Sequence, residues 1–333
     1  MEALISIPYV DIRKGGPLDL LKGHLAGAHA LVVAASGTFG ALSRAASVVA
    51  LPLGDRASRK WLEHNRNPYL GEIGAMADML GRSGVYFLNV CFEWGCTSGV
   101  WNTQDGPLLR RVLDWPFPAL GEYVVVAHQS GPAGAFLNAT WPGVSGVYQA
   151  SAPGRFAAAL NQAPMREHGL GFAGDWLTAR VAAAENGGLP PAHLLRQVFE
   201  TAPDYDTARR MLCETSLAVP AIFILAGIRA EEGCVIERTE TDFVLRPMQD
   251  TRVCAANHFV GREQGWRARP IDSAGRLACA ARLGDTQDDF AWFTPPIANV
   301  NSRLAMNACA ASGALSVIGT SGAAPVTEIF RFS

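Results

Sequence analysis

A β-hairpin near the end of the first third of the chain constrains the fold more than any other feature of the sequence. Two runs of strand-forming residues, 96–103 and 108–115, flank the pair Asp105-Gly106. An Asp-Gly pair between apolar runs is a strong short-range signal for a hairpin, because glycine adopts positive φ at no steric cost. The sequence therefore predicts two antiparallel strands joined at this pair.

The hairpin brings a thiol, a guanidinium and a carboxylate together. Folding about the turn places Cys96 opposite positions 114–115, beside Asp114 and one step of the pleat from Arg111. Arg111 and Asp114 are three residues apart, so an ideal strand points them to opposite faces, and one of them must act from a strand end or a bulge. Arg110 is the adjacent candidate, and register alone does not exclude it. Such a group can serve as a nucleophile site.

Composition favours a large folded core and argues against nucleic acid as a partner. The 333 residues suffice for one large domain or two ordinary ones, and 49% of them are hydrophobic against 17% charged. The formal net charge is −2, so the composition shows no excess of positive charge that would bind a polyanion such as nucleic acid. The seven cysteines are scattered and odd in number, which favours a reducing compartment over a disulfide framework. The expected location is the cytoplasm.

The first residues lack the basic and apolar regions of a secretory signal. Residues 25–43 carry no charge, but glycines, serines and a histidine interrupt them, so we expect a packed or interface helix and no stable membrane span. A homo-oligomer is compatible with this composition.

The pattern of elements predicts a layered α+β domain with no repeat and no interdomain linker. Periodicity predicts helices over 18–33, 41–51, 69–80, 176–185, 192–200, 205–213 and 272–283. Glycine-punctuated runs predict antiparallel strands over 122–128, 134–140, 155–160, 221–227, 234–239, 251–259, 315–319 and 326–332. Residues 85–90 fit a strand or a terminal helical turn.

The hairpin motif also resembles a known family. Cys-Thr-Ser at 96–98, followed by Arg-x-x-Asp-aromatic-Pro-Phe at 111–117, is similar to the N-terminal-nucleophile (Ntn) hydrolases related to acid ceramidase and N-acylethanolamine acid amidase. Choloylglycine hydrolases and penicillin V acylase are more distant members of that superfamily. Residues 68–74 and 89–93 resemble the family's pre-nucleophile segment, and Gly-Cys-Thr at 95–97 is also the junction of the penicillin-forming acyltransferases. The resemblance runs from about residue 69 to the C-terminus and implies a four-layer αββα sandwich of antiparallel sheets.

The resemblance implies that the chain activates itself. In this family the base is the cysteine's own α-amino group, which exists only after the bond between Gly95 and Cys96 has been cut. An unperturbed α-amino group titrates near ~8, which suits proton transfer near neutral pH. The products are a helical segment, 1–95, and a catalytic chain, 96–333, which together form one domain and stay associated. The alternative is that Cys96 is a small buried hydrophobe.

The resemblance also assigns roles around the thiol. Asp114 accepts from the new α-ammonium, and Arg111 holds the thiolate electrostatically; the alternative is a surface ion pair. Asn257 resembles the asparagine that donates to the oxyanion, although an alanine replaces the threonine before it and a histidine follows it. Asn161 resembles the second asparagine of the bile-salt-hydrolase branch, and Arg276 matches a family arginine at a longer spacing. A turn role for each asparagine and a helix-surface role for the arginine are the alternatives.

Trp94, Trp115 and Trp141 are candidates for an apolar substrate wall, although aromatic residues beside strands also serve as plain core. The seven histidines show no metal-ligand spacing, and no Gly-rich phosphate loop follows a strand, so neither a metal nor another cofactor is expected. A papain-like pair of Cys96 and His258 is a rival mechanism. The acid-amidase branch has a site glutamate after the sheet, and residues 169–176 offer no equivalent.

The sequence is best interpreted as a self-processing cysteine amidohydrolase that cleaves a linear amide in an N-acylated small molecule through an acyl-thioester. An acyltransferase that passes the acyl group to an amine is the nearer alternative. An uncut, inactive relative that acts as a binding protein is a second alternative, and a membrane-docked helical module over residues 17–53 is a third. Acyl length and the amine portion are left open.

Overall fold

The computed structural model describes residues 4–36, 41–90, 95–117, 119–262, 264–284 and 289–333. Its helices are α1 (Gly16–Gly23), α2 (Leu25–Ser36), α3 (Ala41–His64), α4 (Leu70–Leu80), α5 (Val85–Asn89), η1 (Leu120–Tyr123), α6 (Gly171–Glu185), α7 (Pro191–Thr201), α8 (Tyr205–Glu214) and α9 (Ser273–Ala280). Its strands are β1 (Tyr9–Asp11), β2 (Gly95–Thr103), β3 (Gly106–Asp114), β4 (Val125–Gly131), β5 (Gly134–Thr140), β6 (Gln149–Ala152), β7 (Phe156–Gln162), β8 (Met165–Arg166), β9 (Ala221–Ala226), β10 (Gly233–Arg238), β11 (Phe243–Pro247), β12 (Arg252–Ala255), β13 (Trp266–Arg267), β14 (Ser302–Cys309), β15 (Leu315–Ser321), β16 (Ala324–Pro325) and β17 (Phe330–Phe332).

Two sheets face each other in the described part of the chain. Eight strands form one sheet in the order β1-β4-β5-β6-β7-β9-β10-β11, and the second sheet has the order β12-β2-β3-β14-β15-β16, with β17 also paired to β15. The central strand β9 is buried on both faces, as its unbroken run of apolar residues requires. One large apolar cluster takes side chains from both sheets, so the main core lies between them.

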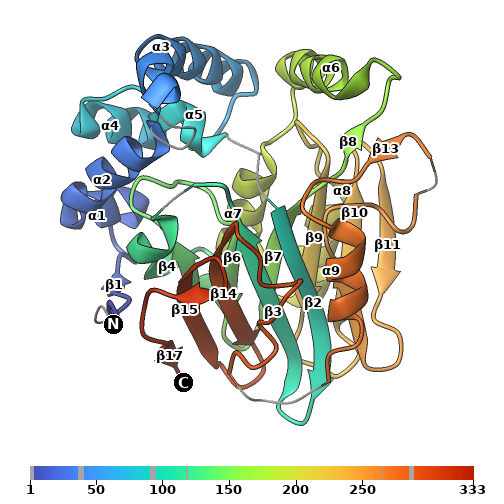
Figure 1. The fold of residues 1–333 in the computed structure, drawn as a ribbon. Coiled ribbons are helices and arrows are strands. Elements are labelled where there is room, and N and C mark those ends of the chain that lie inside the picture. Colours follow the sequence, from blue (N-terminus) through green and yellow to red (C-terminus); the bar gives the residue numbers. More distant parts are fainter. Residues whose placement is uncertain (1–3, 37–40, 91–94, 118, 263, 285–288) are drawn as a thin grey trace.

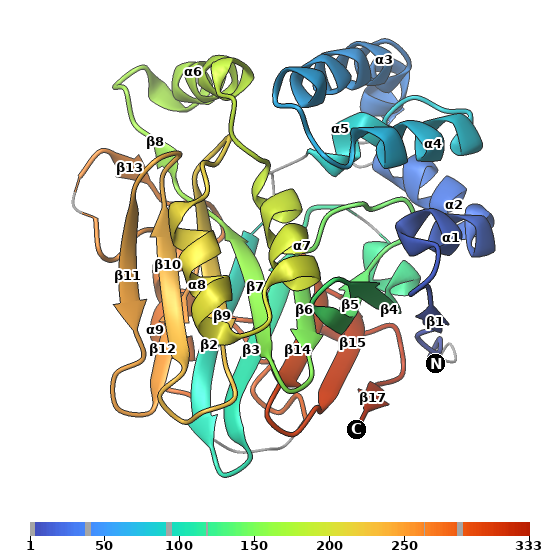
Figure 2. The ribbon, with the colours of Figure 1, turned by 180° about the vertical axis from the view of Figure 1, so that it is seen from behind.

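Helices cover the outer faces of both sheets. Figure 2 shows α7 and α8 in front of the eight-stranded sheet, and Figure 1 shows α9 against β2 and β12 of the other. The result is the αββα layering expected from the family resemblance. Helices α1 to α5 and helix α6 lie beyond one end of the sheets, which is the end at which β2 begins (Figure 1).

The N-terminal helices form a small core of their own around α4, built by Leu21, Leu62, Ile73 and Met76. Helix α2 packs as expected, because Leu31 and Val32 are buried while Val33 stays exposed. Residues 85–89 form a helical turn, not a strand. No helix in the described residues combines the length and apolar character needed to cross a membrane.

Seven of the described strands fall outside the expected strand ranges: β1, β6, β8, β11, β13, β14 and β16. The pattern predicts no strand over Ser302–Cys309, yet β14 occupies the centre of the second sheet between β3 and β15. Its arginine, asparagine, methionine and alanines have little intrinsic preference for a strand, so its place is decided by the partners on either side. The short strands β1 and β11 are the two edge strands of the eight-stranded sheet, and each pairs there with a single neighbour.

Candidate active site

The hairpin forms, with its two-residue turn one position earlier in the chain than expected. Thr103 pairs with Gly106, so the turn consists of residues 104 and 105, and Gly106 takes the positive φ of 114° at the start of β3. Cys96 therefore lies opposite Leu113, not opposite 114–115, and Gly95 lies opposite Asp114. The shift places the carboxylate beside the bond between Gly95 and Cys96.

Arg111 and Asp114 lie on opposite faces of β3, as strand alternation predicts. Arg111 shares the inward face with Ser98, its partner in register, and its Nη1 lies 3.4 Å from Ser98 Oγ. Asp114 is the last residue of β3 and lies on the face toward α9, which satisfies the expectation that one of the two stands at a strand end. Arg110 shares that outer face and stacks over Trp101 at 5.0 Å, so Arg111 is the arginine on the thiol side.

Asn161, on the facing strand β7, joins the two sheets at this point. Its Oδ1 accepts from Ser98 Oγ and from Arg111 Nη1, both at 2.7 Å, and its Nδ2 donates to the Ala256 carbonyl at 3.1 Å. Arg111 also donates from Nε to Gln149 at 3.3 Å. Its buried Nη2 has no hydrogen-bond partner among the described residues, so it is a donor available to a charge that develops there.

Asn257, two residues beyond β12, holds the main chain of Cys96. Its Oδ1 accepts the backbone N–H of Cys96 at 2.7 Å and Nη2 of Arg276 at 2.8 Å. Its Nδ2 donates to the Gln162 carbonyl at 2.8 Å, and its own N–H donates to Ser273 Oγ at 2.8 Å. The side chain thus fixes the nitrogen of Cys96 from one side and the end of β7 from the other.

Arg276 is fully buried on α9, which is not a position for a helix-surface arginine. It donates to the Cys96 carbonyl and, at 2.8 Å, to Thr97 Oγ1, and its Nη1 lies 3.6 Å from Asp114 Oδ2. Asp114 also accepts from Ser302 Oγ at 2.7 Å. These contacts link α9, the start of β2, the end of β3 and β14 around one peptide unit.

The electrostatics of the uncut chain keep the thiol protonated. Burial raises the pKa of Cys96, while the Arg111 guanidinium acts to lower it and the Asp114 carboxylate acts to raise it. Burial also raises the pKa of Asp114, against the opposing effects of Arg276 and Ser302. A thiol in this setting needs a base before it can attack a carbonyl.

The rival histidine is engaged elsewhere. His258 Nδ1 lies 2.7 Å from Ser273 Oγ. Burial lowers the pKa of its imidazole. Among the described residues, no cluster of three His, Cys, Asp or Glu side chains could hold a metal ion.

The proposed tryptophan wall is divided. Trp94 falls outside the described residues. Trp115 and Trp141 line one small apolar hollow, together with Leu31, Leu80 and other side chains of the N-terminal helices. Trp101 packs on the other face of β2, in a separate apolar cluster.

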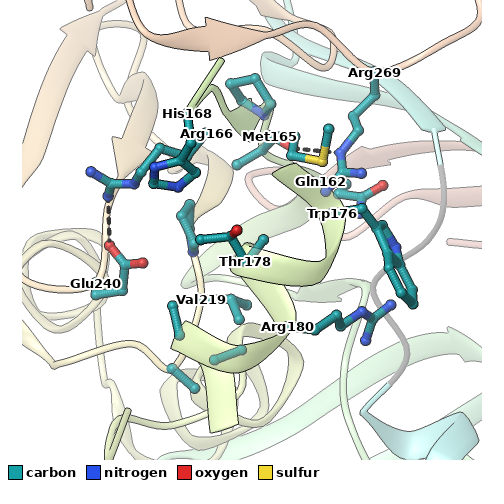
Figure 3. A pocket seen from close by; sticks show the side chains of 17 residues that line it. Gln162, Met165, Arg166, His168, Trp176, Thr178, Arg180, Val219, Glu240 and Arg269 are labelled. Atoms are coloured by element: carbon teal, nitrogen blue, oxygen red, sulfur yellow. Dashed lines mark hydrogen bonds and ion pairs between the residues drawn. The ribbon is translucent and has the colours of Figure 1, made fainter. Parts of the chain in front are cut away.

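A second hollow lies beneath α6 (Figure 3). It is lined by the end of β7, by β8, by α6 and by the segment before β9. Gln162 belongs both to this lining and to the site, because its carbonyl accepts from Asn257.

Sequence reasoning missed several polar partners of the site. Strand alternation could have identified Ser98, because it puts residue 98 on the same face of the strand as Cys96. Gln149 and Ser302 carry no local signal, since their roles depend on strands that meet only in the folded sheets.

Sequence comparisons with known proteins find partial matches to this chain. No protein-family model matches the chain. Over 107 residues it is 32% identical to an acid ceramidase of Heterocephalus glaber, covering 32% of this chain and 26% of that protein. Over 178 residues it is 28% identical to an N-acylethanolamine-hydrolyzing acid amidase of Cavia porcellus, covering 51% and 48%. The chain is therefore similar to an acid ceramidase and to an N-acylethanolamine-hydrolyzing acid amidase over these spans.

The solved structures support the same fold. A Caenorhabditis elegans N-acylethanolamine-hydrolyzing acid amidase ortholog superposes with a TM-score of 0.53 at 19% identity, over 72% of this chain and all of that one. The fold is therefore that of the Ntn hydrolases, as the resemblance predicted. The chain spans between a quarter and a half of the length of the curated acid ceramidase and acid amidase relatives.

Proposed function

We propose that this relative of the acid amidases is a self-processing cysteine amidohydrolase that acts on a linear amide of an N-acylated small molecule. The observation that carries the proposal is the hydrogen bond from the Cys96 N–H to Asn257 Oδ1. That nitrogen is the atom that would become the catalytic base, and a buried side chain already positions it.

Self-processing would begin at the bond between Gly95 and Cys96. The Cys96 sulfur adds to the Gly95 carbonyl carbon, the C–N bond breaks, and the acyl group of Gly95 is held as a thioester while Cys96 gains a free amine. Water hydrolyses the thioester and restores the thiol. Asp114, beside Gly95, and Arg276, on the Cys96 carbonyl, hold the peptide unit in place during this step.

Turnover would repeat the same chemistry on a substrate. The α-amine takes the thiol proton, and the sulfur attacks the amide carbonyl. The proton then passes to the leaving amine, and water releases the acid from the thioester. Arg111 Nη2 is the buried donor that can face the developing charge, and such a donor contributes roughly 3–4 kcal/mol at comparable sites. The hollow lined by Trp115 and Trp141 is our candidate for the acyl chain.

The test is intact-protein mass spectrometry of the purified wild type beside Cys96→Ala. Wild type should yield fragments of about 10 and 25 kDa, in proportion to the 35.5 kDa chain, and the variant should stay whole. The cut protein is then assayed for acid release from N-acyl amides, with and without an added amine to reveal acyl transfer. An intact wild-type chain whose thiol ignores iodoacetamide would instead support an inactive binding protein.

A further inference from the structure

Strand β14 carries an extra residue at the point where it passes Asp114. Leu304 lies opposite Leu113, so an unbroken ladder would put Arg303 opposite Asp114. The observed partner of Asp114 is instead Ser302, because the register shifts between Ser302 and Leu304. Arg303 is therefore the additional residue of a β-bulge. Bulges of this kind occur beside active sites, where they redirect a side chain.

The bulge directs the Arg303 guanidinium to main-chain carbonyls. Arg303 is buried, and its Nε donates to the Phe117 carbonyl at 2.8 Å. Its Nη1 donates to the carbonyls of Val300 at 3.1 Å and Ser302 at 2.8 Å. An arginine directly opposite an aspartate on a neighbouring strand can instead bind both carboxylate oxygens with two parallel hydrogen bonds. The shifted register therefore decides whether Asp114 meets a guanidinium or a hydroxyl.

Ser302 is fully buried and presents a neutral donor to Asp114. Its Oγ lies 2.7 Å from Asp114 Oδ1 and accepts the backbone N–H of Asn299 at 3.0 Å. Because Asn299 donates to this oxygen and an ionised carboxylate only accepts, the hydroxyl hydrogen points at Asp114. The Ser302 N–H also donates to the Asn299 carbonyl at 2.9 Å, and the Asn299 side chain acts as a second donor to the carboxylate. The turn thus fixes the direction of the hydroxyl before any reaction begins.

The other carboxylate oxygen is directed at the bond between Gly95 and Cys96. A Cβ built on Gly95 would lie 3.5 Å from Asp114 Oδ2, and Arg276 Nη1 lies 3.6 Å from the same oxygen. Arg276 also donates to the Cys96 carbonyl. The Ser302 hydrogen bond at Oδ1 therefore fixes the rotation of the carboxylate that keeps Oδ2 at this peptide unit.

We propose that Ser302 is a positioning residue of the reaction. Its hydroxyl, placed by the bulge at Arg303, holds Asp114 Oδ1 so that Oδ2 faces the peptide unit of Cys96 before the cut and the new α-ammonium after it. A neutral donor suits this task better than a cation, because it orients the carboxylate without neutralising its charge. An arginine in the same register would take both oxygens and leave none for the Cys96 nitrogen. This inference rests on the proposed self-processing function.

The experiment compares rates of self-cleavage in variants that each lack one hydroxyl. Every chain is made in a cell-free translation mixture, and the fraction cut between Gly95 and Cys96 is followed by intact mass. Ser302→Ala should slow the cut by about 10- to 100-fold, the range for a lost hydrogen bond to a charged group, and Ser302→Thr should recover most of the rate. Thr327→Val removes another buried hydroxyl, which accepts the Gly319 N–H at 2.8 Å on β15, and should cut at the wild-type rate.

The Asp114→Ala background shows whether Ser302 acts through that carboxylate. With no carboxylate left to hold, adding Ser302→Ala should slow the remaining self-cleavage by no more than about twofold. Equal slowing in both backgrounds, or equal slowing by Thr327→Val, would overturn the positioning role. Self-cleavage of Ser302→Ala at the wild-type rate would also overturn it and leave the proposed function intact. A wild-type chain that stays whole would overturn the proposed function, and this inference with it.

Discussion

Arg110 and Arg111 are neighbours in sequence, yet only Arg111 points toward Cys96. We predict that Arg111→Gln slows self-cleavage and amide hydrolysis by ~100-fold or more, because it removes a buried charge-assisted donor from the thiol side. Arg110→Gln makes the same change of charge on the other face of β3, over Trp101, and serves as the matched control. Cleavage rates are followed by intact mass. Equal loss in both variants would mean that the sheet, and not the site, had been damaged.

His193, on α7, makes the fold sensitive to acid. Its Nδ1 lies 2.8 Å from Asn67 Nδ2, and burial lowers the pKa of its imidazole to about 3. Above pH ~6.5 both folded and unfolded forms are neutral, so its contribution to stability is complete there. As the pH falls below ~6.5, His193 binds a proton in the unfolded form, whereas in the folded form it stays neutral until the pH reaches about 3. The contribution is therefore lost with acidification, by ~2–3 kcal/mol between pH 7 and pH 4.5.

The check is urea unfolding of the uncut Cys96→Ala protein with and without His193→Gln. The second variant should lose less of its unfolding free energy between pH 7 and pH 4.5, by about 2 kcal/mol. If the unfolding free energies of the two proteins fell equally between pH 7 and pH 4.5, His193 would not be the cause of the loss of stability in acid.

At the scale of residues, local patterns predicted the proximity of the hairpin residues well and the positions of distant partners poorly. Cys96, Arg111 and Asp114 come from one hairpin, so their proximity follows from a turn signal and strand alternation. The exact register did not follow, because an Asp-Gly pair can occupy either of two adjacent places in a turn. The place of Asn161 and Asn257 around the thiol is set by three strands that are far apart in sequence. Their roles in catalysis stay predictions.

At the scale of elements, a buried ion cluster joins α4 of the N-terminal segment to α7. Arg196 contacts Glu72 at 2.5 and 3.0 Å and Glu200 at 2.8 Å, and its guanidinium lies 4.0 Å from the centre of the Tyr69 ring. Tyr69 also donates to Glu200 at 2.8 Å. Removing the central cation would leave two carboxylates that are mostly shielded from water.

We predict that Arg196→Met lowers the unfolding free energy of the uncut protein by ~3–5 kcal/mol, the cost of leaving a buried charge without its partner. The exposed pair of Arg209 and Asp206 on α8 provides the control, and Arg209→Met should change stability by less than ~1 kcal/mol. Urea unfolding in the Cys96→Ala background measures both. A loss of equal size in the two variants would contradict a special role for the cluster.

Elements with a strong local pattern were predicted, and elements defined by their neighbours were not. Strand β5 and helix α7 match their expected ranges closely, because each carries its own periodicity. Strand β14 was not predicted, since it is defined by its hydrogen bonds to β3 and β15 and not by a pattern of its own. The αββα layering itself came from the family resemblance, because alternation within single strands does not say which sheet a strand joins.

At the scale of the whole molecule, the segment that self-processing would separate from the catalytic chain, residues 1–95, also pairs with strands of that chain. Strand β1 is the edge strand of the eight-stranded sheet and runs parallel to β4. Val126 donates to the Pro8 carbonyl and Ile12 donates to the His128 carbonyl, both at 2.9 Å. Ile5 exchanges backbone hydrogen bonds with Val326 and Glu328 near the C-terminus. None of these contacts involves the bond between Gly95 and Cys96.

We therefore predict that the cut protein remains one particle that contains both fragments in equal number, and that it separates only in denaturant. Native mass spectrometry measures this directly. The uncut bond between Gly95 and Cys96 should keep residues 1–95 bound in the Arg196→Met variant, because a covalently linked segment rebinds at a high effective concentration. Once the bond is cut, this advantage is lost. Dilution of the cut variant should release fragment 1–95, whereas dilution of the cut wild type or of the uncut variant should not. Separation of the wild-type fragments on cutting would mean that β1 and the α4–α7 cluster do not suffice to hold the halves together, and that the N-terminal segment acts as a propeptide.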